Sequence, residues 1–206
     1  MRRKVNIILN ILIVISGLIG SYIMFFTKMT DVGLTSKGIE NLKFFTILSN
    51  ELCIIIAAAF LIATSLKKNF PITLKLIGAA AVLLTFAVVA FFLQPVNPHV
   101  NLYGGGNLWF HLIVPVLAAV EFITLPKTDR IPLRSAFIAA VPAVIYGIFY
   151  LANILINGIG EWPDTNDWYG FLKWGYAVGA LIFLGNTLLN IGCACLLRSV
   201  KNRIDR

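Results

Sequence analysis

The chain alternates between long apolar runs and short polar segments. Each apolar run is long enough to cross the roughly 30 Å hydrocarbon core of a bilayer as a helix. Helices are favoured because backbone groups in lipid need hydrogen bonds within their own span, and the alternation typical of membrane barrels is missing. We predict an all-α polytopic membrane protein, a six-transmembrane-helix bundle with one domain over residues 1–206. The predicted spans are 5–27, 43–66, 71–94, 107–126, 133–157 and 169–197.

The composition fits a membrane protein, and the charges predict its orientation. Hydrophobic residues make up 59% of the 206 residues, and charged residues make up 13%. The net charge of +8 does not indicate nucleic acid, because all but four of the 17 lysines and arginines fall on one side of the predicted bundle. By the positive-inside rule, both termini are expected in the cytoplasm. The opposite side carries Lys28, Lys37, Lys43, Lys173, Asp31, Glu40, Glu161, Asp164 and Asp167.

Residues that bind cofactors are scarce. The cysteines Cys53, Cys193 and Cys195 form no C-x-x-C pair, and the only histidines are His99 and His111. The glycine run at 104–106 lacks the strand before it and the Gly-Lys-Ser/Thr after it that a phosphate-binding loop requires. We therefore expect no cofactor, no metal and no nucleic acid, with the bilayer and a lipid substrate as partners. The oligomeric state stays open.

Two prolines and one asparagine are expected to shape the fourth and fifth spans. Asn107 is expected to cap the start of the fourth span. Pro115 removes the hydrogen bond to the carbonyl of His111, and Pro142 removes the one to the carbonyl of Ile138. We therefore expect a kink in the fourth span and another in the fifth.

A hydroxyl and an imidazole are predicted at the same depth in two different spans. Thr46 lies about 4.5 Å inside Lys43, which marks the outer start of the second span. His111 lies about 6 Å inside Asn107, at the outer start of the fourth. Ionisable residues within spans are functional candidates, and a hydroxyl beside an imidazole forms a nucleophile with its base. If the two helices are neighbours, these side chains can meet.

Polar side chains also fall into stripes along three of the predicted spans. Residues three, four or seven positions apart share one face of a helix. Such stripes point into a bundle or cavity and away from lipid. They predict one polar pocket between the second, fourth and fifth spans. The stripes are Lys43, Thr46 and Asn50; Asn107 and His111; and Tyr146, Tyr150 and Asn153.

Most of these residues also have an ordinary structural explanation. A threonine in a membrane helix commonly donates to the carbonyl four residues earlier. Asn50 can simply join two helices, and Glu51 can be packed in its protonated form. Lys43 and Lys173 can anchor the chain at the membrane surface. The intramembrane His111 is the hardest of these residues to explain by structure alone.

Two blocks of the sequence resemble the androgen-induced protein family. Residues 42–48 (LKFFTIL) are similar to the W-K-F/Y-L-T-F opening of one span in that family. Residues 107–115 (NLWFHLIVP), followed by Glu121, are similar to its N-x-x-x-H-x-x-x-P helix and the acidic residue after it. A third, weaker similarity covers Gly158 to Trp162-Pro163, after the fifth span. The six-span layout agrees, while the shorter loops and the Lys- and Ile-rich composition favour a bacterial relative.

This resemblance implies a chemistry. The family comprises multipass hydrolases that split fatty acid esters of hydroxy fatty acids with a threonine nucleophile and a histidine base. It implies those roles for Thr46 and His111. We expect an asparagine to orient His111, and free N–H groups near Gly106 and Asn107 to stabilise the oxyanion. The orienting candidates are Asn50, Asn107 and Asn153, and the substrate-binding candidates are Lys43, Tyr146, Tyr150 and Lys173.

Two alternatives stay open at this point. The first is a proton-coupled transporter in which Glu51 and His111 form the relay, although the chain lacks the inverted repeat common in transporters. The second is a non-catalytic scaffold whose polar residues only hold helices together.

Overall fold

The computed structural model describes residues 2–27, 38–96, 98–161 and 164–206, and every regular element within them is helical. Six helical stretches of this part of the chain are long and apolar enough to cross a membrane. The prediction of an all-α membrane bundle with six spans is therefore confirmed. The stretches are Arg2–Phe26, Phe45–Ser65, Ile72–Val96, Gly106–Thr124, Arg134–Asn157 and Tyr176–Ile204.

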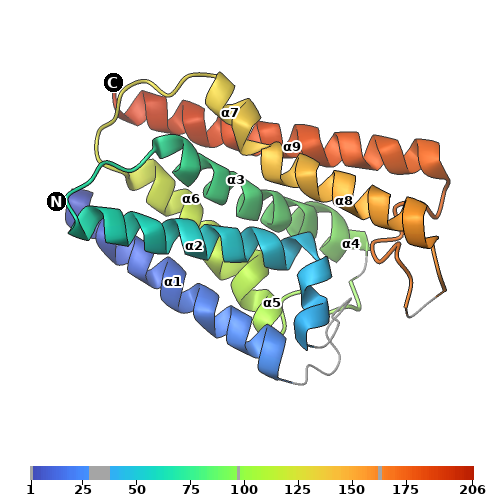
Figure 1. The fold of residues 1–206 in the computed structure, drawn as a ribbon. Coiled ribbons are helices and arrows are strands. Elements are labelled where there is room, and N and C mark those ends of the chain that lie inside the picture. Colours follow the sequence, from blue (N-terminus) through green and yellow to red (C-terminus); the bar gives the residue numbers. More distant parts are fainter. Residues whose placement is uncertain (1, 28–37, 97, 162–163) are drawn as a thin grey trace.

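Several stretches combine more than one helical segment (Figure 1). A 3-10 helix, η1, precedes the second span, and π-helical turns, η2 and η3, interrupt the third and fourth. The segments are α1 (Arg2–Phe26), η1 (Gly38–Lys43), α2 (Phe45–Ser65), α3 (Ile72–Val88), η2 (Val89–Leu93), α4 (Gln94–Val96), α5 (Gly106–Leu108), η3 (Trp109–Ile113), α6 (Val114–Thr124), α7 (Arg134–Ala139), α8 (Val141–Asn157) and α9 (Tyr176–Ile204).

The sixth span differs from its predicted range of 169–197. α9 begins only at Tyr176 and continues to Ile204. The residues before it form turns in which Gly170 and Gly175 have φ angles of +66° and +90°. Only glycine adopts such values freely, so both residues favour turns here, and the helix begins only after Gly175. Residues 169–175 are largely apolar, so the sequence does not distinguish this loop from the start of a membrane span.

The two prolines inside spans distort the backbone in different ways. Pro115 is the second residue of α6 and follows the π-helical turn η3, so the expected kink takes the form of a local π-helix. At Pro142 the fifth span is broken instead: α7 ends at Ala139 and α8 begins at Val141. A proline has no N–H to donate within the helix, and the structure accommodates that loss differently at each position.

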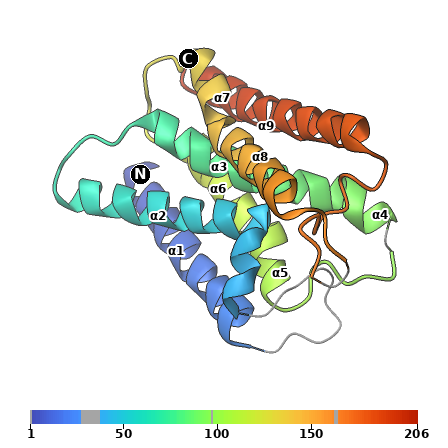
Figure 2. The same ribbon diagram turned by 45° about the vertical axis from the view of Figure 1, so that its right-hand side comes forward.

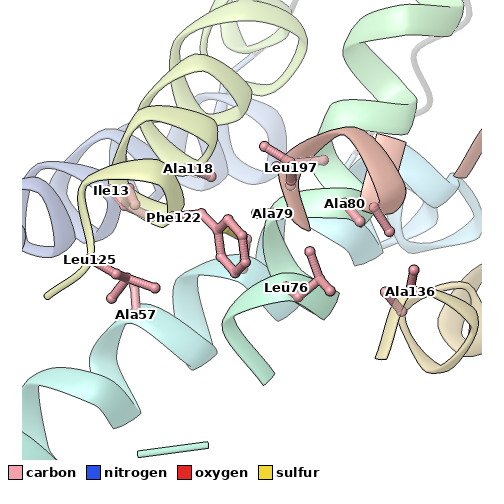
Figure 3. Close-up of a cluster of buried hydrophobic side chains, with 14 of the residues drawn as sticks. Ile13, Ala57, Leu76, Ala79, Ala80, Ala118, Phe122, Leu125, Ala136 and Leu197 are labelled. Atoms are coloured by element: carbon pink, nitrogen blue, oxygen red, sulfur yellow. The ribbon is translucent and has the colours of Figure 1, made fainter. Parts of the chain in front are cut away.

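α3 lies at the centre of the bundle and packs against α2, α6, α7 and α9 (Figures 1 and 2). Ala79 and Ala80 of α3 allow neighbouring helices to approach closely, and Phe122 of α6 fills the space between them (Figure 3). α8 instead exposes large apolar side chains, with Ile148 and Phe149 at 62% and 71% exposure. Lipid is the environment in which such an exposed apolar face is stable.

A buried ion pair between α3 and α6, together with two asparagines of α1, connects three helices inside this core. Lys75 Nζ on α3 lies 3.0 Å from Glu121 Oε1 on α6, and the two side chains are 5% and 1% exposed. Asn6 and Asn10 of α1 donate to Glu121 Oε1 at 2.8 and 2.7 Å. Lys75 Nζ in turn donates to Asn10 Oδ1 at 2.6 Å. We call these four residues the ion-pair cluster.

Candidate functional site

A cavity of about 190 Å³ lies between α2, α3, η3, α8, α9 and the loop of residues 164–175. Most of its wall is formed by aliphatic and aromatic side chains, including those of Met24, Leu84 and Phe183. Its polar lining residues are Thr46, Thr85, Asn107, His111, Tyr146, Tyr169, Asn186 and Thr187.

Both predicted catalytic residues line this cavity. Thr46 is the second residue of α2, and His111 lies in η3. Asn50 connects the two helices, because its Nδ2 donates to the backbone carbonyls of Thr46 at 2.8 Å and Phe110 at 3.2 Å. The helix that carries the hydroxyl and the helix that carries the imidazole are therefore neighbours, and both side chains border the same space.

The hydroxyl of Thr46 is placed differently from those of Thr27, Thr85 and Thr124. Thr27, Thr85 and Thr124 each donate to the carbonyl four residues earlier, at 2.6, 3.5 and 2.8 Å. Thr46 has no such partner in its own helix, because α2 begins at Phe45. Within the described residues its side chain makes no hydrogen bond and borders the cavity. The ordinary explanation for a threonine in a membrane helix thus does not apply to Thr46.

A backbone carbonyl fixes the orientation of His111. The imidazole Nδ1 lies 2.6 Å from the carbonyl oxygen of Leu102. Because a carbonyl can only accept a hydrogen bond, Nδ1 carries a proton, and in the neutral imidazole Nε2 then keeps its lone pair. His111 is 7% exposed and lines the cavity, so its imidazole borders a largely apolar space.

The loop before the fourth span brings Leu102 and His111 together. Gly105 has a φ of +54° and occupies the position before α5, so Asn107 is not the helix cap that the sequence predicts. Gly106 packs so closely on α1 that a Cβ there would lie 2.6 Å from the side chain of Met24. The glycine run is therefore a tight turn that folds the loop back over the start of the fourth span.

The three candidate orienting asparagines have other roles. Asn50 bonds to backbone carbonyls, and its Oδ1 is buried with no partner among the described residues. Asn153 donates to Asn166 Oδ1 at 3.0 Å and belongs to the loop contacts of α8. Asn107 lines the cavity, is 5% exposed, and its amide bonds to nothing within the described residues. The sequence-based assignment missed Leu102, because a backbone carbonyl leaves no signature in side-chain patterns.

Of the two predicted substrate-binding tyrosines, only Tyr146 lines the cavity. Its hydroxyl donates to the carbonyl of Lys43 at 2.7 Å and accepts from Trp168 Nε1 at 3.0 Å. The hydroxyl of Tyr150 instead donates to the carboxylate of Asp167, away from the lining. Asp167 also accepts backbone N–H groups of the loop, at 2.9 Å each. Tyr150 thus anchors the loop and does not line the pocket.

Tyr169 is a cavity residue that the sequence does not reveal. Its hydroxyl accepts the backbone N–H of Phe45 at 2.9 Å, beside Thr46 at the start of α2. Burial raises the pKa of this hydroxyl to about 12, so it stays protonated at neutral pH. The sequence places residue 169 at the start of the sixth span, whereas the structure folds it as a loop against α2.

The two predicted substrate-binding lysines lie outside the cavity lining. Lys43 Nζ lies 5.6 Å from the ring centre of Phe44, and Lys173 Nζ lies 5.7 Å from that of Trp174. Both positions suit interfacial anchoring. Five residues named in the sequence lie outside the described part of the chain: Lys28, Asp31, Lys37, Trp162 and Pro163.

Glu51 does not face His111. Its carboxylate accepts a hydrogen bond of 2.5 Å from Ser21 Oγ on α1, and it is not part of the cavity lining. The predicted relay between Glu51 and His111 therefore has no direct contact in the structure.

No protein-family model, curated protein or solved structure matches this chain. The resemblance to the androgen-induced protein family thus stays a prediction. Among the described residues, no group of three or more His, Cys, Asp or Glu side chains is placed to hold a metal ion.

Proposed function

We propose that this chain is an intramembrane lipid-ester hydrolase with Thr46 as nucleophile and His111 as base. One observation carries the proposal: the two residues line the same cavity, and among the described residues neither the Thr46 hydroxyl nor the His111 Nε2 has a hydrogen-bond partner. A nucleophile and a correctly oriented base on adjacent elements form the usual arrangement for acyl transfer.

The proposed reaction has two steps. Thr46 Oγ1 attacks the ester carbonyl carbon while its proton moves to His111 Nε2, and the alcohol then leaves with that proton. A water molecule next attacks the acyl-threonine while His111 again accepts a proton. The carbon–oxygen bond to Thr46 breaks, the proton returns to Oγ1, and the fatty acid is released. The carbonyl of Leu102 holds the imidazole in one tautomer throughout.

Asn107 is the proposed donor to the oxyanion. The backbone N–H of Asn107 already donates to the carbonyl of Gly104 at 3.1 Å, so it is not free for this role. The side-chain amide borders the cavity one helical turn before His111 and is bonded to nothing in the described residues. A fixed amide donor stabilises the negative charge that develops on the carbonyl oxygen.

The substrate and the location follow from the same features. The apolar cavity lies within a bundle of membrane-spanning helices, so an ester dissolved in lipid is the natural substrate class. The family resemblance favours fatty acid esters of hydroxy fatty acids. The charge distribution supports a multipass protein with both termini in the cytoplasm, and the composition supports a bacterial membrane.

A fluorophosphonate probe tests the nucleophile directly. Detergent-purified protein is treated with the probe, digested and mapped by mass spectrometry. Attack by Thr46 Oγ1 would displace fluoride from phosphorus and leave the label on the peptide that contains Thr46. Thr46→Ala should prevent labelling, whereas Thr124→Val, which removes a threonine hydroxyl outside the cavity, should not. Labelling that persists in the folded Thr46→Ala protein would overturn the assignment.

A further inference from the structure

We propose that Asn186 and Thr187 of α9 form a second polar subsite in the cavity, which binds a hydroxyl or ester oxygen of an uncharged lipid. The inference rests on the proposed hydrolase function and narrows its substrate class. The favoured substrate is a neutral ester with an additional oxygen group, as in a monoacylglycerol. This narrowing departs from the fatty acid esters of hydroxy fatty acids that the family resemblance favours, because those esters carry a free carboxylate.

The first support is that Asn186 and Thr187 border the cavity without hydrogen-bonding partners. Both lie within the membrane-spanning stretch of α9 and line the cavity. Within the described residues, neither side chain makes a hydrogen bond, although Thr85 and Thr124 on other spans bond back to their own helices. Polar groups without partners are costly in an apolar environment, so this pair is suited to receive a polar group of a ligand.

The second support comes from Asn190, one helical turn beyond Asn186 on the same face of α9. Its side chain is fully buried behind the cavity lining, and neither its oxygen nor its nitrogen has a partner among the described residues. Buried amides with both atoms unpaired are rare in folded proteins. Asn186, Thr187 and Asn190 therefore form a polar stripe on an otherwise apolar part of α9, and none of them is an isolated polar residue.

The third support is the absence of charge in the cavity. No lysine, arginine, aspartate or glutamate is among the residues that line it in the described part of the chain. A carboxylate inside it would therefore lack a cation, which is a severe penalty in an apolar site. A hydroxyl can donate to the oxygen of Asn186 and accept from its nitrogen, so neutral oxygen groups fit these side chains.

The subsite is separate from the catalytic pair. Thr46 and His111 come from α2 and η3, whereas Asn186 and Thr187 come from α9. α9 packs against α3, α6, α7 and α8, and in Figures 1 and 2 it lies on the far side of α3 from α1. A ligand that reaches both walls must therefore carry its second oxygen group away from the ester that is cleaved.

The first experiment measures substrate preference. kcat/KM is determined for a monoacylglycerol and for the ethyl ester of the same fatty acid, with wild-type protein and with the double variant Asn186→Leu, Thr187→Val. We expect the wild type to prefer the monoacylglycerol by about tenfold or more, as one or two hydrogen bonds allow. We expect that ratio to fall toward one in the variant. An unchanged ratio, or a wild type that prefers the ethyl ester, would overturn the proposal.

The second experiment does not require hydrolysis. A 1-O-alkylglycerol, which has no ester, should raise the Tm of the Thr46→Ala protein, and the fatty acid of equal chain length should raise it less. Adding Asn186→Leu and Thr187→Val should remove the alkylglycerol effect, whereas adding Thr124→Val should not. Equal shifts with the fatty acid, or a shift that survives in the triple variant, would contradict the subsite.

The two experiments together separate the two proposals. If no ester is cleaved but the alkylglycerol shift depends on Asn186 and Thr187, the hydrolase proposal fails and the subsite stands. If esters are cleaved by Thr46 with the same preference in the double variant, the hydrolase stands and the subsite fails. Monodisperse elution of each variant in detergent shows that loss of binding is not loss of folding.

Discussion

The bundle contains two polar regions of opposite character. In the ion-pair cluster, Lys75 and Glu121 are bonded to each other and to Asn6 and Asn10, all at 2.6–3.0 Å. In the cavity, the hydroxyl of Thr46 and the amide of Asn107 have no partner within the described residues. Both regions are surrounded by apolar side chains, so the difference lies in how completely their polar groups are bonded.

This contrast separates a structural role from a chemical one. Polar groups that satisfy one another hold α1, α3 and α6 in a fixed arrangement and leave nothing to bind a ligand. Polar groups that face a cavity without partners destabilise the fold slightly and are available to a substrate. A charged or polar side chain inside a span therefore does not by itself identify a functional site. Whether its hydrogen-bonding groups already have partners must also be known.

The largest effect is expected at the catalytic pair. Thr46→Ala and His111→Ala should each lower kcat for ester cleavage by roughly 10³-fold or more, because the residues act as one unit. The Tm of each variant should stay near that of the wild type. The measurement is fatty acid release by detergent-purified protein, with Thr124→Val as the control. Retained activity in either folded alanine variant would contradict the mechanism.

The next largest effect is expected in the ion-pair cluster. Glu121→Ala should lower the free energy of unfolding by about 3–5 kcal/mol, because it leaves the buried charge of Lys75 unpaired. The double variant Lys75→Met, Glu121→Leu should recover part of this loss, since it removes both charges. Thermal unfolding in detergent measures both effects. A double variant no more stable than Glu121→Ala would show that the charges do not stabilise each other.

A smaller effect on rate is expected at Asn107. Asn107→Leu should lower kcat by about 10²- to 10³-fold, as for other oxyanion donors, with a smaller change in KM. Asn107→Asp retains the shape but replaces the donor with an acceptor, so its kcat should not recover. Steady-state kinetics with one soluble ester separate the two parameters. If Asn107→Leu changes only KM, Asn107 binds substrate and does not stabilise the transition state.

The smallest effect is expected at Asp205, which directly follows α9 and the sixth membrane-spanning stretch. Lys201 Nζ pairs with Asp205 at 2.7 Å and donates to the carbonyl of Leu125 at 2.6 Å. Although partial burial acts in the opposite direction, hydrogen bonds from Lys201 and Thr128 lower the pKa of Asp205 below its ordinary value of 3.8. Asp205→Asn should therefore lower the free energy of unfolding at neutral pH by roughly 1–2 kcal/mol.

The pH dependence of that contact has a defined sign. A carboxylate whose pKa is lowered by folding stabilises the protein above its unfolded pKa, and the stabilisation is lost as the pH falls through its folded pKa. The Tm difference between wild type and Asp205→Asn should therefore shrink at strongly acidic pH. A difference that stays constant from neutral to acidic pH would show that ionisation of Asp205 is not its source.

Parts of the candidate site were predictable and parts were not. Helical spacing and depth can be counted along a helix, so the sequence predicts Thr46 and His111 at the same level, and both residues line the cavity. The positions of Leu102, Tyr169 and Asn186 at the cavity cannot be derived by counting residues along a helix. They depend on a loop that folds back on the fourth span, on a segment that is apolar but not helical, and on the rotation of α9 toward the cavity.

The sequence by itself determined the six spans and their all-helical character, because lipid requires backbone groups to be bonded within each span. It also determined which few polar residues enter the spans. Only the tertiary structure decided which of those residues are bonded to one another and which face an open space. That outcome depends on contacts between helices distant in the sequence, as in the link between Lys75 of α3 and Glu121 of α6.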